Sequence, residues 1–188
     1  PTETATPMPT ATRTVTATVT PTLPAPVYQR AVNVGGGAYT DGGGIVWQAD
    51  QPYSSGGWGY VNPPPPTLTS MSYANTHAID GSADDPLYQS ERFSLASYRF
   101  TVPNGTYQVE LRFAEIYPYT QPGKRVFDVQ IEGATVLANL DVVASVWLWR
   151  ALDYTFTTTV ADGILAVDFT PRVGYPKLNA IKVTSVSP

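Results

Sequence analysis

The middle of the chain holds two segments in which apolar and polar residues alternate with a strict period of two. Residues 97–102 and 107–113 each place all their apolar side chains on one side, because successive side chains of a strand point to opposite faces. Asn104-Gly105 lies between them, and this dipeptide favours a tight turn because both residues accept a positive φ. The pattern predicts an amphipathic β-hairpin and restricts the fold to strands with one buried face.

Similar short alternating segments occur along most of the chain, separated by Gly, Asn and Asp. The clearest turns are Glu132-Gly133 and Ala161-Asp162-Gly163, and the strands before and after the second turn are expected to pair. No window sustains a 3.6-residue period. The further expected strands are residues 31–34, 45–47, 127–131, 154–160, 165–169 and 181–186. Eight or more strands at this spacing predict an all-β, antiparallel β-sandwich of jelly-roll type.

The first 26 residues differ from the rest of the chain. They contain 10 Thr and 6 Pro, and their only charged residues are Glu3 and Arg13. This segment has too little apolar surface to offset the entropy of ordering it, and Thr/Pro tracts are typical of extended linkers between modules. We expect residues 1–26 to form a disordered linker within a larger exported protein, with a flexible terminus as the alternative. Residues 27–188 are expected to form one domain.

Composition excludes several classes of function. The net charge is −4 with only 11 Lys and Arg among 188 residues, so no basic face is available for nucleic acid. Apolar runs are too short for membrane insertion. The chain has no Cys and a single His, His77, which argues against thiolate and most zinc chemistry. We expect no metal and no cofactor, and no enzymatic activity.

Glu115 is the carboxylate of most interest. It follows Phe113 at the end of an expected strand, on the inward face, and a buried carboxylate there requires a cation, for which Arg92 is the candidate. We interpret this pair as structural. The alternative is a glycosidase that uses Glu115 with an Asp, since glycoside hydrolysis needs two carboxyl groups about 5–10 Å apart. Asp41, which lies among glycines, is expected to form a turn.

Aromatic residues exceed what the core requires. They make up 12% of the chain, and many fall in expected loops or at strand ends. A flat ring packs on the apolar C–H face of a pyranose, and a rigid β scaffold positions such loops well. Trp47 is expected to cap one end of the sandwich. Tyr117 and Tyr119, in a loop stiffened by Pro118, are expected to contact a ligand.

Six motifs in this order resemble the malectin family of carbohydrate-binding modules. They are VNVGG at 32–36, AYTD at 38–41, LYQSER at 87–92, FAEIY at 113–117, RVFDV at 125–129 and IEG at 131–133. The resemblance covers about residues 32–183. It implies a β-sandwich lectin without catalytic activity, of the kind that occurs in bacteria as a module of exported multi-domain proteins.

The resemblance also implies a sugar site made of loop aromatics and an Asp. The family's aromatic-Gly pair corresponds to Trp58-Gly59, with Tyr60 close by, and its aromatic after Glu-Arg corresponds to Phe93. The ring that ends the FAEIY motif is Tyr117.

Two positions of that site depart from the family pattern. Pro118 occupies the place of the next ring, for which Tyr119 is expected to substitute. The family's acidic residue corresponds to Gly174, so a charged acceptor for sugar hydroxyls is missing, and Tyr175 is the nearest ring. The expected ligand-binding residues are Trp58, Tyr60, Phe93, Tyr117, Tyr119 and Tyr175.

The sequence thus predicts a non-catalytic module of a larger secreted or cell-surface protein. Its expected partners are neighbouring domains of the same polypeptide and a glucose-containing oligo- or polysaccharide, with α-glucan as one candidate. The alternative is a protein-interaction, adhesion or spacer module that binds no sugar.

Overall fold

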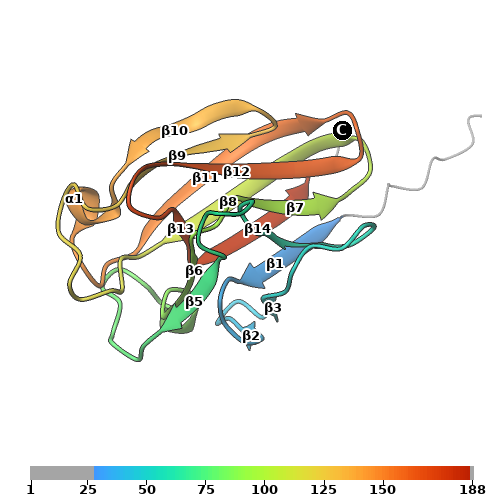
Figure 1. Cartoon of the computed structure of the whole chain (residues 1–188). Coiled ribbons are helices and arrows are strands. Elements are labelled where there is room, and N and C mark those ends of the chain that lie inside the picture. Colours follow the sequence, from blue (N-terminus) through green and yellow to red (C-terminus); the bar gives the residue numbers. More distant parts are fainter. Residues whose placement is uncertain (1–27, 187–188) are drawn as a thin grey trace, which may run out of the picture.

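The structure, a computed structural model, describes residues 28–186 and is built almost entirely of strands (Figure 1). The predicted linker, residues 1–26, lies outside the described residues. One sheet has the order β11 (Leu152–Val160), β8 (Gly105–Phe113), β14 (Ala180–Ser185), β1 (Gln29–Asn33), β3 (Val46–Ala49) and β2 (Tyr39–Thr40). A second sheet has the order β10 (Ala134–Leu140), β9 (Val126–Ile131), β12 (Ile164–Val173), β7 (Ser97–Thr101) and β4 (Trp58–Val61).

A small third sheet lies at one end of these two. It consists of β13 (Lys177–Leu178), β6 (Ser90–Phe93) and β5 (Met71–Ala74). The helical elements are α1 (Val142–Val146) and a 3-10 turn, Asp85–Leu87. None of the helices within residues 28–186 is long and apolar enough to cross a membrane.

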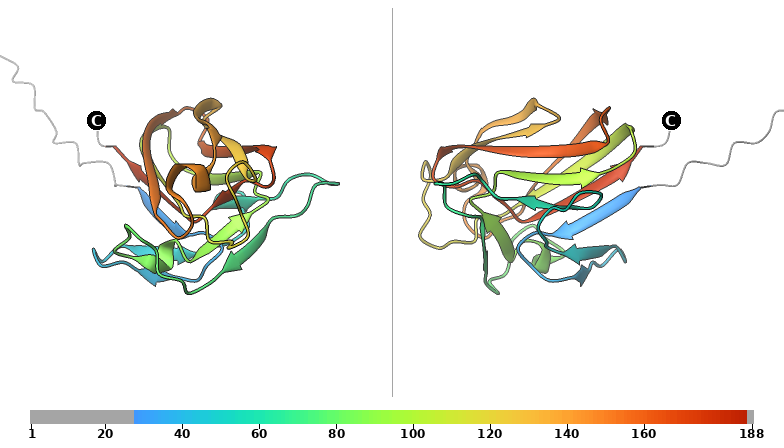
Figure 2. Two further views of the ribbon diagram at one scale, coloured as in Figure 1. Left: turned by 90° about the vertical axis from the view of Figure 1, so that its left-hand side faces the viewer. Right: turned by 45° about the vertical axis from the view of Figure 1, so that its right-hand side comes forward.

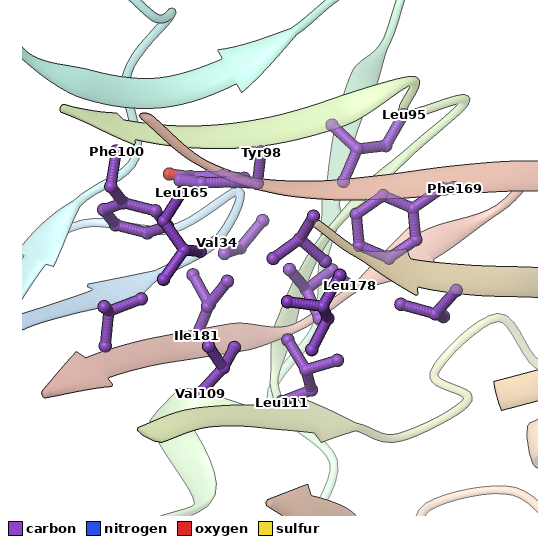
Figure 3. Close-up of a cluster of buried hydrophobic side chains, with 14 of the residues drawn as sticks. Val34, Leu95, Tyr98, Phe100, Val109, Leu111, Leu165, Phe169, Leu178 and Ile181 are labelled. Carbon is purple, nitrogen blue, oxygen red and sulfur yellow. The ribbon is translucent and has the colours of Figure 1, made fainter. Parts of the chain in front are cut away.

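The two large sheets pack face to face around one hydrophobic core. Tyr98 and Phe100 of β7 point toward Val109 and Leu111 of β8, and all four are fully buried (Figure 3). The polar residues between them face outward, as the period of two requires. The predicted antiparallel β-sandwich is therefore confirmed. Within it, β1 and β3 are a parallel pair.

The predicted hairpin at Asn104-Gly105 is wrong, because β7 and β8 belong to different sheets. β7 pairs with β12 and β4, whereas β8 pairs with β11 and β14. The Asn104 amide instead donates a hydrogen bond to the carbonyl oxygen of Ala161, at 2.9 Å. Two amphipathic strands bury their apolar faces equally well by pairing or by facing each other across a sandwich, so the period alone does not distinguish these arrangements.

The same correction applies to the turn at residues 161–163, where β11 and β12 also lie in different sheets. By contrast, the predicted turn at Glu132-Gly133 is confirmed, and it closes a tight hairpin. It joins the paired strands β9 and β10, and the two residues have φ angles of 51° and 75°.

Trp47 is fully buried in a second, smaller hydrophobic cluster. The Arg112 guanidinium lies 4.6 Å from its ring, so Trp47 packs on the outer face of the six-stranded sheet, whereas the prediction placed it at an end of the sandwich. Its indole Nε1 donates a hydrogen bond to Oδ2 of Asp41, at 2.9 Å, and this bond lowers the pKa of Asp41. The other carboxylate oxygen of Asp41 accepts hydrogen bonds from the backbone N–H groups of Gly43 and Ile45. Asp41 therefore forms the turn that the sequence predicts.

The two ends of the described chain lie side by side. The backbone N–H of Ser185 donates to the carbonyl oxygen of Tyr28, at 2.8 Å. This point lies at the opposite end of the molecule from β5, β6, β13 and α1 (Figures 1 and 2). The end that carries the small sheet is therefore remote from residues 28 and 186.

Candidate functional site

A pocket of about 290 Å³ lies against the small sheet. Tyr73 of β5 is paired with Glu91 of β6, and Phe93 lies two residues after Glu91, so that all three face the same side of the sheet. The loop after β8 and the turn after β12 close the pocket. The lining residues are Tyr73, Glu91, Phe93, Tyr117, Arg125 and Tyr175.

Aromatic rings form the walls of this pocket in two pairs. The rings of Tyr73 and Tyr117 meet edge to face, with centroids 5.8 Å apart and an angle of 83°. The rings of Phe93 and Tyr175 lie 6.4 Å apart at 51°. Tyr117 and Tyr175 are both exposed, so each presents part of its ring to solvent. The pocket thus offers apolar ring surfaces together with tyrosine hydroxyls.

A group of four charged side chains forms the floor: Glu91 and Arg125 line the pocket, and Glu115 and Lys177 lie behind them. Glu91, Glu115 and Lys177 are fully buried, and Arg125 is largely buried. The Lys177 ammonium contacts Oε2 of Glu91 and lies 3.8 Å from Oε1 of Glu115. Arg125 Nε lies 2.9 Å from Oε2 of Glu115. Two carboxylates and two cations leave no net charge, which is the condition under which charges tolerate burial.

The charged floor also positions two of the walls. Oε1 of Glu115 accepts a hydrogen bond from the backbone N–H of Tyr117, at 3.0 Å. Arg125 Nη1 donates to the carbonyl oxygen of Tyr175, at 2.8 Å. Loss of Glu115 or Arg125 would therefore remove a contact that positions an aromatic ring, and would also leave an opposite charge without its partner.

Burial raises the pKa of Glu91, and the neighbouring Glu115 carboxylate acts in the same direction. Lys177 and Arg125 oppose this rise because they stabilise the ionised form.

The expected partner of Glu115 was wrong. Glu115 is buried against cations, as predicted, but these are Arg125 and Lys177 and not Arg92. Arg92 lies between two pocket-facing residues of β6 and therefore points to the other side of the sheet. There its Nε donates to Oδ2 of Asp50, at 2.6 Å.

The structure brings three of the predicted ligand-binding residues together at the pocket, namely Phe93, Tyr117 and Tyr175. Tyr119 lies just outside, with its ring centroid 5.5 Å from that of Tyr117, and is the most exposed of the large hydrophobic side chains described.

Trp58 and Tyr60 of β4 do not line the pocket. Both rings are partly buried against the sandwich core. Trp58 lies beneath the guanidinium of Arg30, at 5.4 Å, and Tyr60 beneath that of Arg92, at 3.5 Å.

Sequence reasoning did not place Tyr73 in the ligand site, and of the four floor residues it singled out only Glu115. The alternation of Met71 and Tyr73 was the available signal for Tyr73, but β5 spans only four residues and was not expected as a strand. Glu91 and Arg125 lie within the motifs that carry the family resemblance. Nothing in the sequence alone indicates that Lys177 is buried, because its neutralising carboxylates come from two distant segments.

Gly174, which the resemblance aligns with the family's acidic residue, lies in a turn whose backbone requires glycine. Its φ is +66°, and a Cβ atom there would lie 2.6 Å from the carbonyl oxygen of Lys124. No side chain fits at this position unless the backbone moves. The turn is therefore built for glycine, and the pocket lacks an acid on this side.

Fold and site together define a β-sandwich module with an aromatic pocket at the end remote from residues 28 and 186. The profile of the Malectin domain matches residues 28–181. The chain belongs to the malectin family.

Curated relatives agree with this assignment. Malectin of Homo sapiens is 31% identical over 146 residues, which is 73% of this chain and 44% of the relative. Receptor-like protein 4 of Arabidopsis thaliana is 40% identical over 109 residues, which is 53% of this chain and 17% of the relative. The chain spans less than half the length of these relatives.

Solved structures share the fold. The β-glucuronidase of Bacteroides uniformis is 29% identical with a TM-score of 0.76, and the match covers 85% of this chain but only 18% of the glucuronidase. The ANX1 ectodomain of Arabidopsis thaliana has a TM-score of 0.68 at 16% identity, covering 86% of this chain and 49% of the ectodomain. At this identity the second match shows the fold alone.

Proposed function

We propose that this chain is a non-catalytic carbohydrate-binding module of a larger secreted protein. It holds a glucose-containing oligo- or polysaccharide in the pocket between β5, β6 and the loops that carry Tyr117 and Tyr175. The observation that carries the proposal is the combination of four aromatic walls with a polar, charge-neutral floor.

A pyranose has the same two-sided character as this pocket. Its C–H faces pack on aromatic rings, and its hydroxyls bond to polar groups at the ring edge. The volume of about 290 Å³ lies at the lower end of the range for small-molecule sites, which suits the end of a saccharide chain. We expect a dissociation constant between about 1 μM and 1 mM, equivalent to about −8 to −4 kcal/mol.

The state of the carboxylates supports a binding function over a glycosidase. A glycosidase needs one carboxyl group that donates a proton and a second that acts as nucleophile or base. Here both Glu91 and Glu115 are buried, and each is neutralised by a cation. No Asp lines the pocket, so the expected partner for Glu115 has no candidate among the lining residues.

The setting in a secreted protein rests on the Thr/Pro tract of residues 1–26. Because residues 28 and 186 lie at the end remote from the pocket, flanking domains would leave the pocket accessible. Attachment to a neighbouring domain raises the effective concentration of a weak binder near its ligand.

The test is an amide NMR titration of the 28–186 domain with maltose, nigerose and longer α- and β-glucans. We expect shifts around Phe93, Tyr117 and Tyr175, and loss of these shifts in Tyr117→Ala. Shifts centred on Trp58 and Tyr60 instead would move the site to β4. If no glucan causes shifts at tens of millimolar, the glucan proposal fails and the protein-interaction alternative takes precedence.

A further inference from the structure

Two aromatic side chains are far more exposed than any other large hydrophobic residue described. Tyr119 is 79% exposed and Trp147 is 68% exposed. Single exposed apolar side chains are common on protein surfaces, whereas exposed apolar side chains that cluster mark interaction sites. Tyr119 lies at the rim of the pocket, whereas Trp147 follows α1 and belongs to no site described above.

The backbone that carries Trp147 lies beside the backbone that builds the pocket. Leu148 forms a parallel β-bridge with Glu115, and the N–H of Trp149 donates to the carbonyl oxygen of Glu115, at 3.0 Å. Glu115 belongs to the floor, and two residues later Tyr117 forms a wall. The loop that continues from Tyr117 and the segment around α1 lie at the same end of the molecule (Figure 1).

A second contact ties these two segments together. The N–H of Gly123 donates to the Asp141 carboxylate, which also caps the N-terminus of α1 through the N–H of Ala144. One end of the loop between Tyr117 and Gly123 therefore lies beside the segment that carries Trp147, after the C-terminus of α1. The other end lies beside the N-terminus of α1. Tyr119 lies within this loop, so the backbone segments that carry Tyr119 and Trp147 are neighbours at this end of the molecule.

Trp147 is held in a backbone conformation that side chains avoid. Its φ is +69° with a ψ of −176°, a region populated almost only by glycine. The conformation is fixed by its surroundings. The N–H of Trp147 donates to the carbonyl oxygen of Val143, and the carbonyl oxygen of Trp149 accepts from the N–H of Asp80. Glycine would suit this backbone better than tryptophan, and the indole contributes little burial, so the fold itself does not explain why tryptophan is present.

We propose that Trp147 is a stacking platform outside the pocket that contacts further units of the same saccharide chain, so that the ligand is an oligosaccharide or polysaccharide longer than the pocket. This inference rests on the proposed function. In this arrangement the saccharide chain runs from the pocket past Tyr117 and Tyr119 to Trp147. An exposed indole on a fixed backbone offers a flat apolar face, and only its two side-chain torsions have to be ordered on binding.

The experiment measures affinity against chain length by calorimetry, with maltose through maltoheptaose as probes. For the native protein, affinity should rise with length beyond the units that fill the pocket. Trp147→Gly should lower the affinity for maltoheptaose by about three- to tenfold and leave that for maltose unchanged. Its melting temperature should equal or exceed that of the native protein, because glycine relieves the positive φ.

Trp147→Phe is the matched variant, since it retains a ring on the same backbone, and it should keep most of the affinity for maltoheptaose. Tyr117→Ala should weaken binding of every chain length equally. If Trp147→Gly binds maltoheptaose as the native protein does, or if native affinity does not depend on length, this inference is wrong while the proposed function stands. If no member of the series binds, this inference is overturned, and the proposed function is overturned as well only if nigerose and the β-glucans also cause no shifts in the NMR titration.

Discussion

The molecule contains two clusters of acidic and basic side chains that differ mainly in their depth. On the outer face of the six-stranded sheet, Glu110 of β8 contacts Arg112 at 2.7 Å and Lys182 of β14 at 2.7 Å. These three side chains keep contact with solvent. Under the pocket, Glu91 contacts Lys177 where neither side chain reaches solvent. The residue types match, but the surroundings do not.

Depth reverses the direction in which the acid's pKa moves. Partial burial acts to raise the pKa of Glu110, but hydrogen bonds from Lys182 and Arg112 outweigh it and lower that pKa. For Glu91, burial dominates and raises the pKa even though Lys177 and Arg125 oppose it. The outer cluster is thus a modest stabiliser of the sheet, whereas the inner cluster costs free energy that only complete pairing offsets.

The largest expected effect comes from breaking the inner cluster. Lys177→Met should reduce the free energy of unfolding by about 3–5 kcal/mol, or prevent folding, because it leaves Glu91 buried without its main cation. The matched variant in the outer cluster, Lys182→Met, should cost about 0–1 kcal/mol. Urea denaturation of both variants measures the two values. Equal losses would mean that burial does not separate the clusters.

The next effect concerns the glycine turns at the two ends of the molecule. Gly174→Ala combines a positive φ with a Cβ atom 2.6 Å from the Lys124 carbonyl oxygen, and should cost about 2–4 kcal/mol. Gly133→Ala, in the β9–β10 turn, has a similar φ of +75° but no atom within 4 Å of the added Cβ. It should cost about 1–2 kcal/mol.

Thermal unfolding of the two glycine variants gives the comparison. A cost for Gly174→Ala no greater than that for Gly133→Ala would show that the Lys124 backbone yields easily. An acidic residue could then be introduced at position 174 without damage to the pocket.

The contrast between the clusters also explains what the sequence could predict. The outer positions and the core follow from a period of two, so the strands, their buried faces and the sandwich were predictable from residues such as Phe100 and Leu111. Which strands pair was not predictable, because β7 and β8 present the same pattern whether they are neighbours or face each other. Local turn chemistry does not decide this either, since Glu132-Gly133 joins paired strands whereas Asn104-Gly105, the stronger hairpin signal, joins strands of different sheets.

The candidate site was predictable only in part, for a related reason. Phe93, Tyr117 and Tyr175 stand out because they are rings at strand ends, and the structure gathers them at one pocket. The floor combines Glu91, Glu115, Arg125 and Lys177 from four separate segments. Such long-range pairing leaves no local pattern in the sequence. Lys177 therefore cannot be distinguished from an ordinary surface lysine before the structure is known.

The third prediction uses pH to separate the clusters. A carboxyl group whose folded pKa is raised gives stability that is present below its unfolded pKa and is lost as pH rises through the folded pKa. The native protein should therefore lose stability relative to Glu91→Gln as pH rises above about 4.5. A group with a lowered folded pKa behaves oppositely, so the native protein should lose stability relative to Glu110→Gln as pH falls below about 4.5.

The measurement is the free energy of unfolding of the native protein and both variants between pH 3 and pH 7. The decisive quantity is the difference in free energy of unfolding between the native protein and each variant. The sign of its slope against pH distinguishes the two clusters. Slopes of the same sign would mean that pairing with Lys177 and Arg125 outweighs burial at Glu91, and the two clusters would then differ in depth but not in their effect on the acid.

The smallest expected effect concerns an ion pair that is more exposed to solvent than either cluster. Asp80 and Arg150 form an ion pair in which both side chains are more than half exposed. Asp80→Asn should change the free energy of unfolding by no more than about 0.5 kcal/mol, because solvent screens the pair and the backbone bonds of Asp80 to Trp149 and Ala151 remain. Urea denaturation at low and at 1 M salt measures it. A loss above about 1 kcal/mol that persists at 1 M salt would place this pair with the buried cluster, because buried pairs are screened much less than exposed ones, and depth would no longer be the property that ranks the three.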